Sequence, residues 1–343
     1  MSYYDGTKIL SLNDINGNKP EVYIVTTNRT GGKTTYFGRL CINRFIRNKS
    51  KFALLYRFNY ELSDVAVKFF KDIGGLFFPE YEMTAFPKAS GIFAELMLNN
   101  TPCGYAITLN AADNIKKYSH IFNDVEAILF DEFQPESNRY CSNELEKFLS
   151  IHTSIARGHG KQTRYVPVYM LGNAVTLLNP YYTALGIAER LQSETKFLRG
   201  DGFVFENGFI ESASEAMKAS GFNKAFSSVK YSAYGAQNVY LHDNYTFIEK
   251  PPGRSKYIGT LRYRGNNYGI REYSELGIIY CDDKADNTFP VRISVTTEDH
   301  NINYIMLKKS DLFIANLRYF FDKGCFRFKN LSCKEVILKT ISY

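Results

Sequence analysis

The chain has 343 residues, a length that allows two domains, and its 42 basic and 35 acidic residues give a net charge of +7. Apolar residues make up 45% and charged residues 22%, which excludes a disordered chain and allows a packed core. No apolar run reaches the roughly 18 residues of a membrane span, and the polar segment Met1–Asn18 has no signal-peptide pattern. The six cysteines and five histidines are scattered, so we expect reduced thiols in a cytosolic protein and no cysteine–histidine metal centre.

Strand-like and helix-like segments alternate over about the first 200 residues. The strand-like runs are almost continuously apolar, which predicts a mainly parallel α/β sheet covered on both faces. Gly74-Gly75 is expected to end the second helix, and Asn99-Asn100-Thr101-Pro102 to turn a hairpin. The predicted strands are Glu21–Thr26, Phe52–Phe58, Ile92–Leu98, Cys103–Leu109, Val125–Phe130 and Val166–Leu171, and the predicted helices are Lys33–Ile46, Glu61–Ile73 and Asn143–Ile155.

The composition changes after residue 203. Residues 204–237 are rich in Ser, Ala, Gly and Phe and are interpreted as a linker with one short helix, Glu211–Ser220. Residues 238–343 predict a small α+β domain, whose helix Ser310–Lys323 has Ser310 as its N-cap and Gly324 as its C′ residue. The predicted strands of this domain are Tyr245–Lys250, Lys256–Arg264, Asn267–Glu275, Ile278–Cys281 and Phe289–Thr297.

Positive charge is concentrated at the two ends of the chain. Residues 1–50 and residues 301–343 each contain 8 basic and 3 acidic residues, a net charge of +5 for each segment. Two basic ends suit a polyanionic partner. An ordinary solvated surface explains the charge alone equally well.

The strongest motif is Thr27-Asn28-Arg29-Thr30-Gly31-Gly32-Lys33-Thr34, which follows a predicted strand and begins a helix. This order is typical of a P-loop, in which backbone N–H groups surround the phosphates of ATP. Lys33 would neutralise the β- and γ-phosphates and Thr34 would ligate Mg²⁺, with Thr35 continuing the site. Thr27 replaces the usual first glycine. The alternative interpretation is a glycine-rich turn before a helix.

A second motif, Ala127-Ile128-Leu129-Phe130-Asp131-Glu132, is an apolar strand that ends in two carboxylates. In P-loop NTPases the strand beside the P-loop strand ends in this way. Asp131 is assigned to the metal and Glu132 to the general base that polarises the attacking water. The alternative is a helix-capping pair or solvated loop carboxylates. The two motifs together favour an ATPase.

Two further residues are candidates for the same chemistry. Arg157 follows a predicted helix and could reach the γ-phosphate of a neighbouring subunit as an arginine finger, or it could simply stabilise the helix C-terminus. Asn173 follows a predicted strand and could sense the γ-phosphate or hold the water. A turn asparagine with a local hydrogen bond is the alternative.

The order of these blocks resembles the genome-packaging (DNA-encapsidation) ATPases of small protein-primed podoviruses. The resemblance covers most of the chain and is densest in the first 180 residues or so. Besides the P-loop, the blocks that support it are Ile42-Asn43-Arg44-Phe45-Ile46, Tyr56-Arg57, Glu61-Leu62, Ile128-Leu129-Phe130-Asp131-Glu132-Phe133, Gly172-Asn173-Ala174-Val175 with Asn179-Pro180-Tyr181, and Phe247-Ile248-Glu249-Lys250.

The resemblance implies an FtsK/HerA-like P-loop motor with an additional-strand, RecA-like core. Such a motor uses ATP and Mg²⁺ between the subunits of a ring, expected to be a homopentamer, to drive double-stranded DNA into a preformed procapsid. It would work in the host-cell cytoplasm, transiently on the portal vertex, with a packaging RNA in some relatives and no membrane. Arg157 matches the trans-acting finger of the family, Arg29 matches a family arginine, and Asn59 replaces a family lysine.

The second domain is implied to be ribonuclease-H-like, without a working metal site. Asp282, Asp283 and Asp286 follow or lie near a predicted strand, but no further ordered acidic cluster completes a two-metal site. The alternatives to a motor are a nucleotide-switched viral assembly protein and a nuclease with an accessory ATPase.

Contacts with DNA are predicted from charge only. A motor that moves any sequence must grip phosphates and not bases. The candidate pore-loop residues are Lys116 and Lys117, before the Asp131 strand, and Arg139, after it. Plain surface charge is the alternative for each of them.

Overall fold

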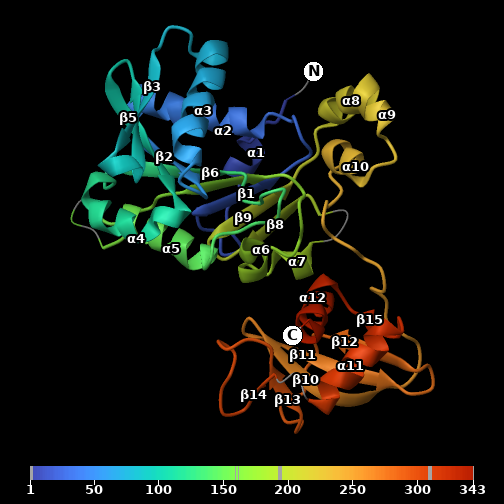
Figure 1. Cartoon of the computed structure of the whole chain (residues 1–343). Helices are drawn as coiled ribbons and strands as arrows, with labels where there is room; N and C mark the ends of the chain where they lie inside the picture. Colours follow the sequence, from blue (N-terminus) through green and yellow to red (C-terminus); the bar gives the residue numbers. More distant parts are fainter. Residues whose placement is uncertain (1–2, 159, 161, 192–194, 308–310, 343) are drawn as a thin grey trace. The chain divides into compact units, whose positions relative to one another are not determined.

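The computed structural model describes residues 3–158, 160, 162–191, 195–307 and 311–342 (Figure 1). Contacts divide the chain into two units, residues 1–242 and 243–343, and each unit is described by itself. Within the described ranges no helix is long and apolar enough to cross a membrane.

Nine strands form the sheet of the first unit. Six of them, β5-β2-β6-β7-β1-β9, are mutually parallel, while β4 and β3 extend one edge and β8 the other in antiparallel pairing. In sheet order the strands are β3 (Met83–Lys88), β4 (Phe93–Leu98), β5 (Thr101–Thr108), β2 (Lys51–Tyr56), β6 (Val125–Asp131), β7 (Val168–Gly172), β1 (Val22–Thr26), β9 (Phe203–Asn207) and β8 (Phe197–Gly200).

Helices cover both faces of this sheet, as the continuous apolar strands predict (Figure 1). Successive residues of β6 show the two layers, because neighbouring side chains on a strand point to opposite faces. Leu129 joins the core that α2 builds through Phe37, whereas the Phe130 ring packs against Phe148 of α5 and Tyr181 of α6. The helices are α1 (Thr7–Leu10), α2 (Lys33–Asn48), α3 (Glu61–Phe77), α4 (Ala112–Ile115), α5 (Glu144–Ile155), α6 (Pro180–Ala184), α7 (Ile187–Arg190), α8 (Glu211–Ala219), α9 (Gly221–Ala225) and α10 (Lys230–Gln237), with short 3₁₀ segments η1 (Ala89–Gly91), η2 (Leu109–Ala111) and η3 (Lys116–Ile121).

Several sequence predictions for this unit are confirmed. The parallel α/β sheet is present, and the hairpin turns at Asn99 and Asn100, whose φ angles of 46° and 59° suit a tight turn between β4 and β5. The predicted stop at Gly74-Gly75 is wrong, since α3 continues to Phe77.

The segment expected to be a linker is structured. β9 pairs in parallel with β1, and α8, α9 and α10 follow it inside the first unit. The first unit therefore continues to residue 242 and does not end at residue 203, while the second unit begins at residue 243, close to the expected start at residue 238. The position expected for the Asp131 strand is also corrected: β7 lies between β6 and β1, because each of them pairs with β7.

The second unit is an α+β structure with a six-stranded sheet. The antiparallel strands β10, β11 and β12 are extended in parallel by β13 and β14 next to β10 and by β15 next to β12. This order fits the ribonuclease-H-like domain that the resemblance implies. The elements are β10 (Lys256–Tyr263), β11 (Asn266–Tyr273), β12 (Ile278–Asp282), β13 (Arg292–Ser294), β14 (Ile305–Met306), α11 (Leu312–Asp322), β15 (Phe326–Phe328) and α12 (Leu331–Ile341).

Some details of the second unit differ from prediction. Tyr245–Lys250 is not a strand and contributes only one isolated bridge, at Ile248. Ser310 lies outside the described residues, and the N-cap of α11 is Asp311, whose carboxylate accepts from the Phe313 N–H at 2.8 Å. The helix α12, whose buried face includes Val336 and Ile337, was not predicted.

Candidate active site

The P-loop lies between the carboxyl end of β1 and α2, as predicted. Thr27 is fully buried and its N–H donates to the Gly172 carbonyl at 3.3 Å. It does not have the positive φ that would demand glycine, so the missing first glycine leaves the loop intact. The positive φ angles fall instead at Thr30 (59°) and Gly32 (91°).

Asn28 fixes the loop to the segment that was expected to be a linker. Its side-chain amide donates to the Ile210 carbonyl at 3.0 Å and its Oδ1 accepts from the Ile210 N–H at 2.8 Å. A Cβ on Gly31 would lie 2.9 Å from the Ile210 side chain, so the loop and residue 210 are in close contact. The residues after β9 therefore form one wall of the P-loop.

Lys33 is buried, and its Nζ donates to Asn173 Oδ1 at 2.6 Å. Loss of hydration lowers the pKa of Lys33, and the same effect raises the pKa of Asp131 against the nearby lysine charge. The Thr34 side chain, which lines the same small cavity as Asp131, acts in the opposite direction and favours the charged carboxylate. Four of the predicted residues, from β1–α2, β6 and β7, thus meet at one edge of the sheet.

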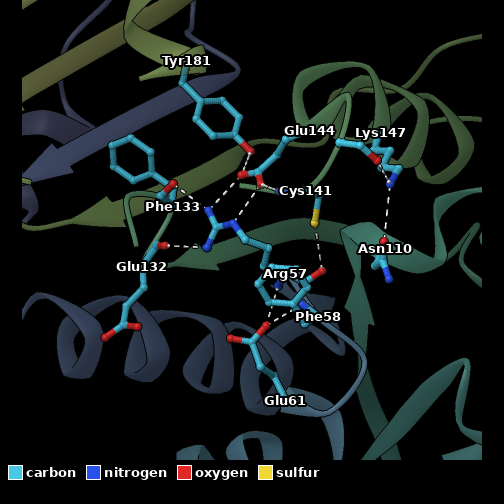
Figure 2. Close-up of polar contacts among 11 residues, drawn as sticks. Arg57, Phe58, Glu61, Asn110, Glu132, Phe133, Cys141, Glu144, Lys147 and Tyr181 are labelled. Carbon is cyan, nitrogen blue, oxygen red and sulfur yellow. Dashed lines mark hydrogen bonds and ion pairs between the residues drawn. The ribbon is translucent and has the colours of Figure 1, made fainter. Parts of the chain in front are cut away.

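Glu132 has a strained backbone, with a φ of 52°, directly after β6. Its carbonyl accepts from Arg57 Nη1 at 3.3 Å, and the Phe133 carbonyl accepts from Arg57 Nη2 at 2.8 Å. Figure 2 shows the Glu132 carboxylate pointing away from Arg57. Loss of hydration, and then the carboxylates of Asp131 and Glu136, raise the pKa of Glu132, which is the direction that suits a general base.

Arg57 is itself held by a buried ion pair with Glu144, the first residue of α5 (Figure 2). Two bonds of 2.8 Å join the guanidinium to the two carboxylate oxygens, and the side chains are only 5% and 1% exposed. Glu144 also accepts from the Cys141 N–H at 2.7 Å and the Tyr181 hydroxyl at 2.9 Å. This set of contacts fixes the loop after Asp131 to β2, α5 and α6.

Arg29, in the middle of the P-loop, is held by residues outside the loop. It forms an ion pair with Glu136 at 2.6 Å and a hydrogen bond with the Tyr231 hydroxyl, and its N–H donates to the Gly235 carbonyl at 3.1 Å. Tyr234 also donates to Glu136, at 2.9 Å. α10 therefore packs directly on the P-loop.

The loop lines a cavity of about 540 Å³, a volume in the range of small-molecule sites. Gly31, Lys33 and Thr35 contribute to its wall, together with the aromatic rings of Tyr36 and Phe77. Thr34 and Asp131 also share a smaller neighbouring cavity of about 190 Å³. A hydroxyl and a carboxylate side by side are the donors that Mg²⁺ prefers, so these residues fit that ion.

Arg157 is not part of this cluster. It is exposed just after α5, which begins at Glu144 near the Asp131 loop. A 12-residue helix separates the two ends by about 18 Å. Arg157 therefore lies near the amino ends of the strands, on the side of the sheet opposite to its own P-loop.

The predicted DNA-contact residues are exposed but do not come together. Lys116 and Lys117 lie in η3, which leads into the amino end of β6, whereas Arg139 follows the carboxyl end of the same strand. Lys116 is 3.5 Å from Asp113 in a solvent-exposed pair. Their role in DNA binding stays a prediction.

Arg29 and Arg57 belong to predicted motifs, but the distant partners that hold them in place could not be predicted. Arg57 and Glu144 are 87 positions apart, and Arg29 and Tyr231 are 202 apart, so no local pattern joins them. One signal was available: Arg57 is a lone charge at the end of an apolar strand, where a buried partner is required.

A parallel sheet with a buried P-loop lysine, and an Asp–Glu pair at the same edge with one strand between them, defines a P-loop NTPase of the additional-strand, RecA-like class. A family model for the podovirus DNA encapsidation protein (Gp16) matches residues 1–342, and the chain belongs to this family. The resemblance inferred from the motifs is thereby confirmed.

Similar proteins agree with this assignment. The DNA packaging proteins of Bacillus phage PZA and Bacillus phage phi29 are each 25% identical over 338 residues, which cover 97% of this chain and 95% of theirs. A chain of the bacteriophage Phi-29 viral genome packaging motor assembly aligns with a TM-score of 0.72 at 22% identity, covering 100% of this chain and 98% of that one. The Phi-28 gp11 DNA packaging motor gives 0.61 at 16% identity, covering 99% and 98%. These two structural likenesses show that the fold is shared.

Proposed function

We infer that the protein is an ATP-driven translocase that packages double-stranded viral DNA into a preformed procapsid. The observation that carries this inference is the convergence of Lys33, Asn173, Asp131 and Glu132 at one sheet edge, in a member of the DNA encapsidation family. Similar proteins from Bacillus phages bear the name DNA packaging protein over nearly the full length of this chain.

The residues of the site divide the chemical work. Lys33 and the P-loop N–H groups bind the phosphates of ATP, and Thr34 and Asp131 would hold Mg²⁺, which would neutralise charge on the phosphates. Glu132 accepts a proton from the attacking water, and Asn173 orients the phosphate end through its contact with Lys33. Arg57 keeps the Glu132 backbone in place.

The position of Arg157 supports hydrolysis between subunits. An exposed arginine about one helix length from its own P-loop has no path to the γ-phosphate of the same chain, but it is free to enter the site of a neighbour. A ring of identical subunits supplies that neighbour at every site. We propose a homopentamer, docked on the portal of the procapsid in the host-cell cytoplasm, with a packaging RNA as a further partner.

Glu132→Gln tests the chemistry. The variant keeps ATP binding but loses turnover, because an amide cannot accept the proton of the attacking water. Nucleotide binding and phosphate release, measured side by side, separate these steps. Wild-type turnover in the variant would remove Glu132 as the base.

The two other candidate functions have less support. A nucleotide switch has no reason to hydrolyse ATP faster on DNA, so DNA-stimulated turnover favours the motor. A nuclease needs free carboxylates, but Asp282 pairs with Arg271 at 2.8 Å and Asp283 with Lys329 at 2.6 Å. In the described part of the chain no group of three metal-ligating side chains is found.

A further inference from the structure

A second large cavity lies at the amino ends of the strands of the first sheet, whereas the P-loop lies at their carboxyl ends. It has a volume of about 530 Å³ and is lined by residues at the amino ends of β2, β6 and β7. The P-loop follows the carboxyl end of β1, so this cavity is separate from the hydrolysis site. Four cationic side chains from different segments line it, namely Lys19, Arg44, Lys51 and Arg164.

One of the four cations is neutralised within the protein. Lys51 Nζ lies 2.6 Å from the Asp124 carboxylate. Loss of hydration lowers the pKa of Lys51, but the contacts with Asp124 and Tyr105 together raise it above its ordinary value. The cavity lining includes one carboxylate, the exposed Glu126. Three cations therefore face one carboxylate, which leaves the cavity positively charged.

The other three cations have neutral partners within the described ranges. Arg44 Nη1 donates to the Tyr169 hydroxyl at 2.8 Å, and Lys19 Nζ lies 4.4 Å from the centre of the Tyr165 ring. Arg164 Nη2 donates to two backbone carbonyls, while its Nε is buried and has no hydrogen-bond partner. These partners carry no negative charge, so the three side chains keep their positive charge.

We propose that this cavity binds phosphate groups of a nucleic-acid backbone. Arginine forks and lysine ammonium groups are the side chains that bind phosphate oxygens, and Ser50 and Thr163 add hydroxyl donors to the same lining. Part of the positive charge of residues 1–50 lies at this cavity, because Lys19 and Arg44 belong to that segment. The choice of DNA over other polyanions rests on the proposed function.

The test compares Arg44→Gln with Arg47→Gln in the full-length protein. Both arginines lie on α2 and both variants lose one charge, but Arg47 is exposed and does not line the cavity. Affinity for a short duplex DNA of mixed sequence is measured over a series of salt concentrations, with an ATP analogue present. Losing one phosphate contact reduces the steepness of the plot of log affinity against log salt concentration by about 0.9. If the variant and the wild type bind equally at 1 M salt, the variant therefore binds about eightfold more weakly at 0.1 M salt.

Arg44→Gln is expected to show this change while Arg47→Gln and Arg44→Lys stay close to wild type. Lys19→Gln, which removes an exposed charge and leaves the core intact, repeats the test if Arg44→Gln unfolds. Basal ATP hydrolysis should be unchanged in all four variants. The same measurement with a duplex RNA of equal length shows which nucleic acid the cavity binds. Equal losses of affinity for DNA and RNA indicate a shared phosphodiester contact, and a loss of affinity for one of them identifies that nucleic acid as the partner.

Two results would overturn the proposal. One is an unchanged salt slope for both nucleic acids in Arg44→Gln and Lys19→Gln. The other is weaker self-association without nucleic acid, measured by sedimentation, which would assign the cavity to an acidic segment of a second copy. In either case DNA-stimulated hydrolysis can persist, so failure here is distinguishable from failure of the motor function.

Discussion

Removing Arg57 should lower both the stability of the first unit and its turnover, and a second substitution should restore only the stability. In Arg57→Met the carboxylate of Glu144 stays 99% buried with the Cys141 N–H and the Tyr181 hydroxyl as its remaining donors. Breaking a buried pair by removing one partner costs about 3–5 kcal/mol. The Glu132 and Phe133 carbonyls also lose their donors, so we expect the upper part of that range.

The second variant, Arg57→Met with Glu144→Gln, separates the two effects. Replacing the orphaned carboxylate by an amide removes the buried charge and should recover about 2–3 kcal/mol of the loss. Turnover should not recover, because nothing then holds the backbone of Glu132. A displacement of the base of about 1 Å costs roughly a hundredfold in kcat.

Denaturant unfolding and steady-state ATP hydrolysis give the two readouts, with ATP binding measured separately. The expected pattern is a low kcat in both variants, with ATP affinity close to wild type and stability restored only in the double variant. A double variant with wild-type kcat would refute the positioning role of Arg57 and leave it a structural residue only.

Three other predictions follow from the contacts. Arg157→Ala and Lys33→Ala chains, each inactive alone, should regain part of the ATP hydrolysis when mixed into one ring, because one chain supplies an intact P-loop and the other an intact arginine finger. No recovery in mixed rings of confirmed composition would argue against a finger that acts in trans. Burial raises the pKa of Glu206 although the Tyr4 hydroxyl donates to its carboxylate, so its stabilising contribution is present below its unfolded pKa and lost as pH rises through the folded value. Thermal unfolding across pH should show this loss in wild type, and Glu206→Gln, which does not titrate, should not show it. Gly104→Ala would place a Cβ 2.2 Å from the Phe52 carbonyl oxygen and should lower the unfolding free energy by more than about 2 kcal/mol, whereas a neutral result would mean that β5 can shift away from β2.

The sequence was sufficient where a signal is local. The P-loop and the Asp131-Glu132 strand are continuous motifs in a required context, and the Asn99-Asn100 turn is set by two residues that tolerate positive φ. Asn173 was found for the same reason, since parallel strands deliver their ends to one edge of a sheet.

The sequence was insufficient where a residue depends on a distant partner. β9 carries a short apolar run that looks like a connector until β1 is placed beside it, and Ile210 gains meaning only through Asn28, 182 positions earlier. Arg29 matched a family arginine, but its ion pair with Glu136 could not be seen in the chain order. Such contacts depend on the order of the strands in the sheet, which the local sequence pattern does not predict.

The place of β1 in the sheet has a consequence for biosynthesis. β1 is among the first strands to leave the ribosome, yet its two neighbours, β7 and β9, are among the last of the first unit. At typical rates of elongation the wait between Thr26 and Asn207 is on the order of tens of seconds. Until β7 is made, both edges of the apolar β1 are unpaired, and one edge stays unpaired until β9 follows. Unpaired strand edges expose the nascent chain to aggregation and make it a substrate for chaperones. A fragment that stops at residue 203 would contain β7 but not β9, and would leave one edge of β1 permanently unpaired.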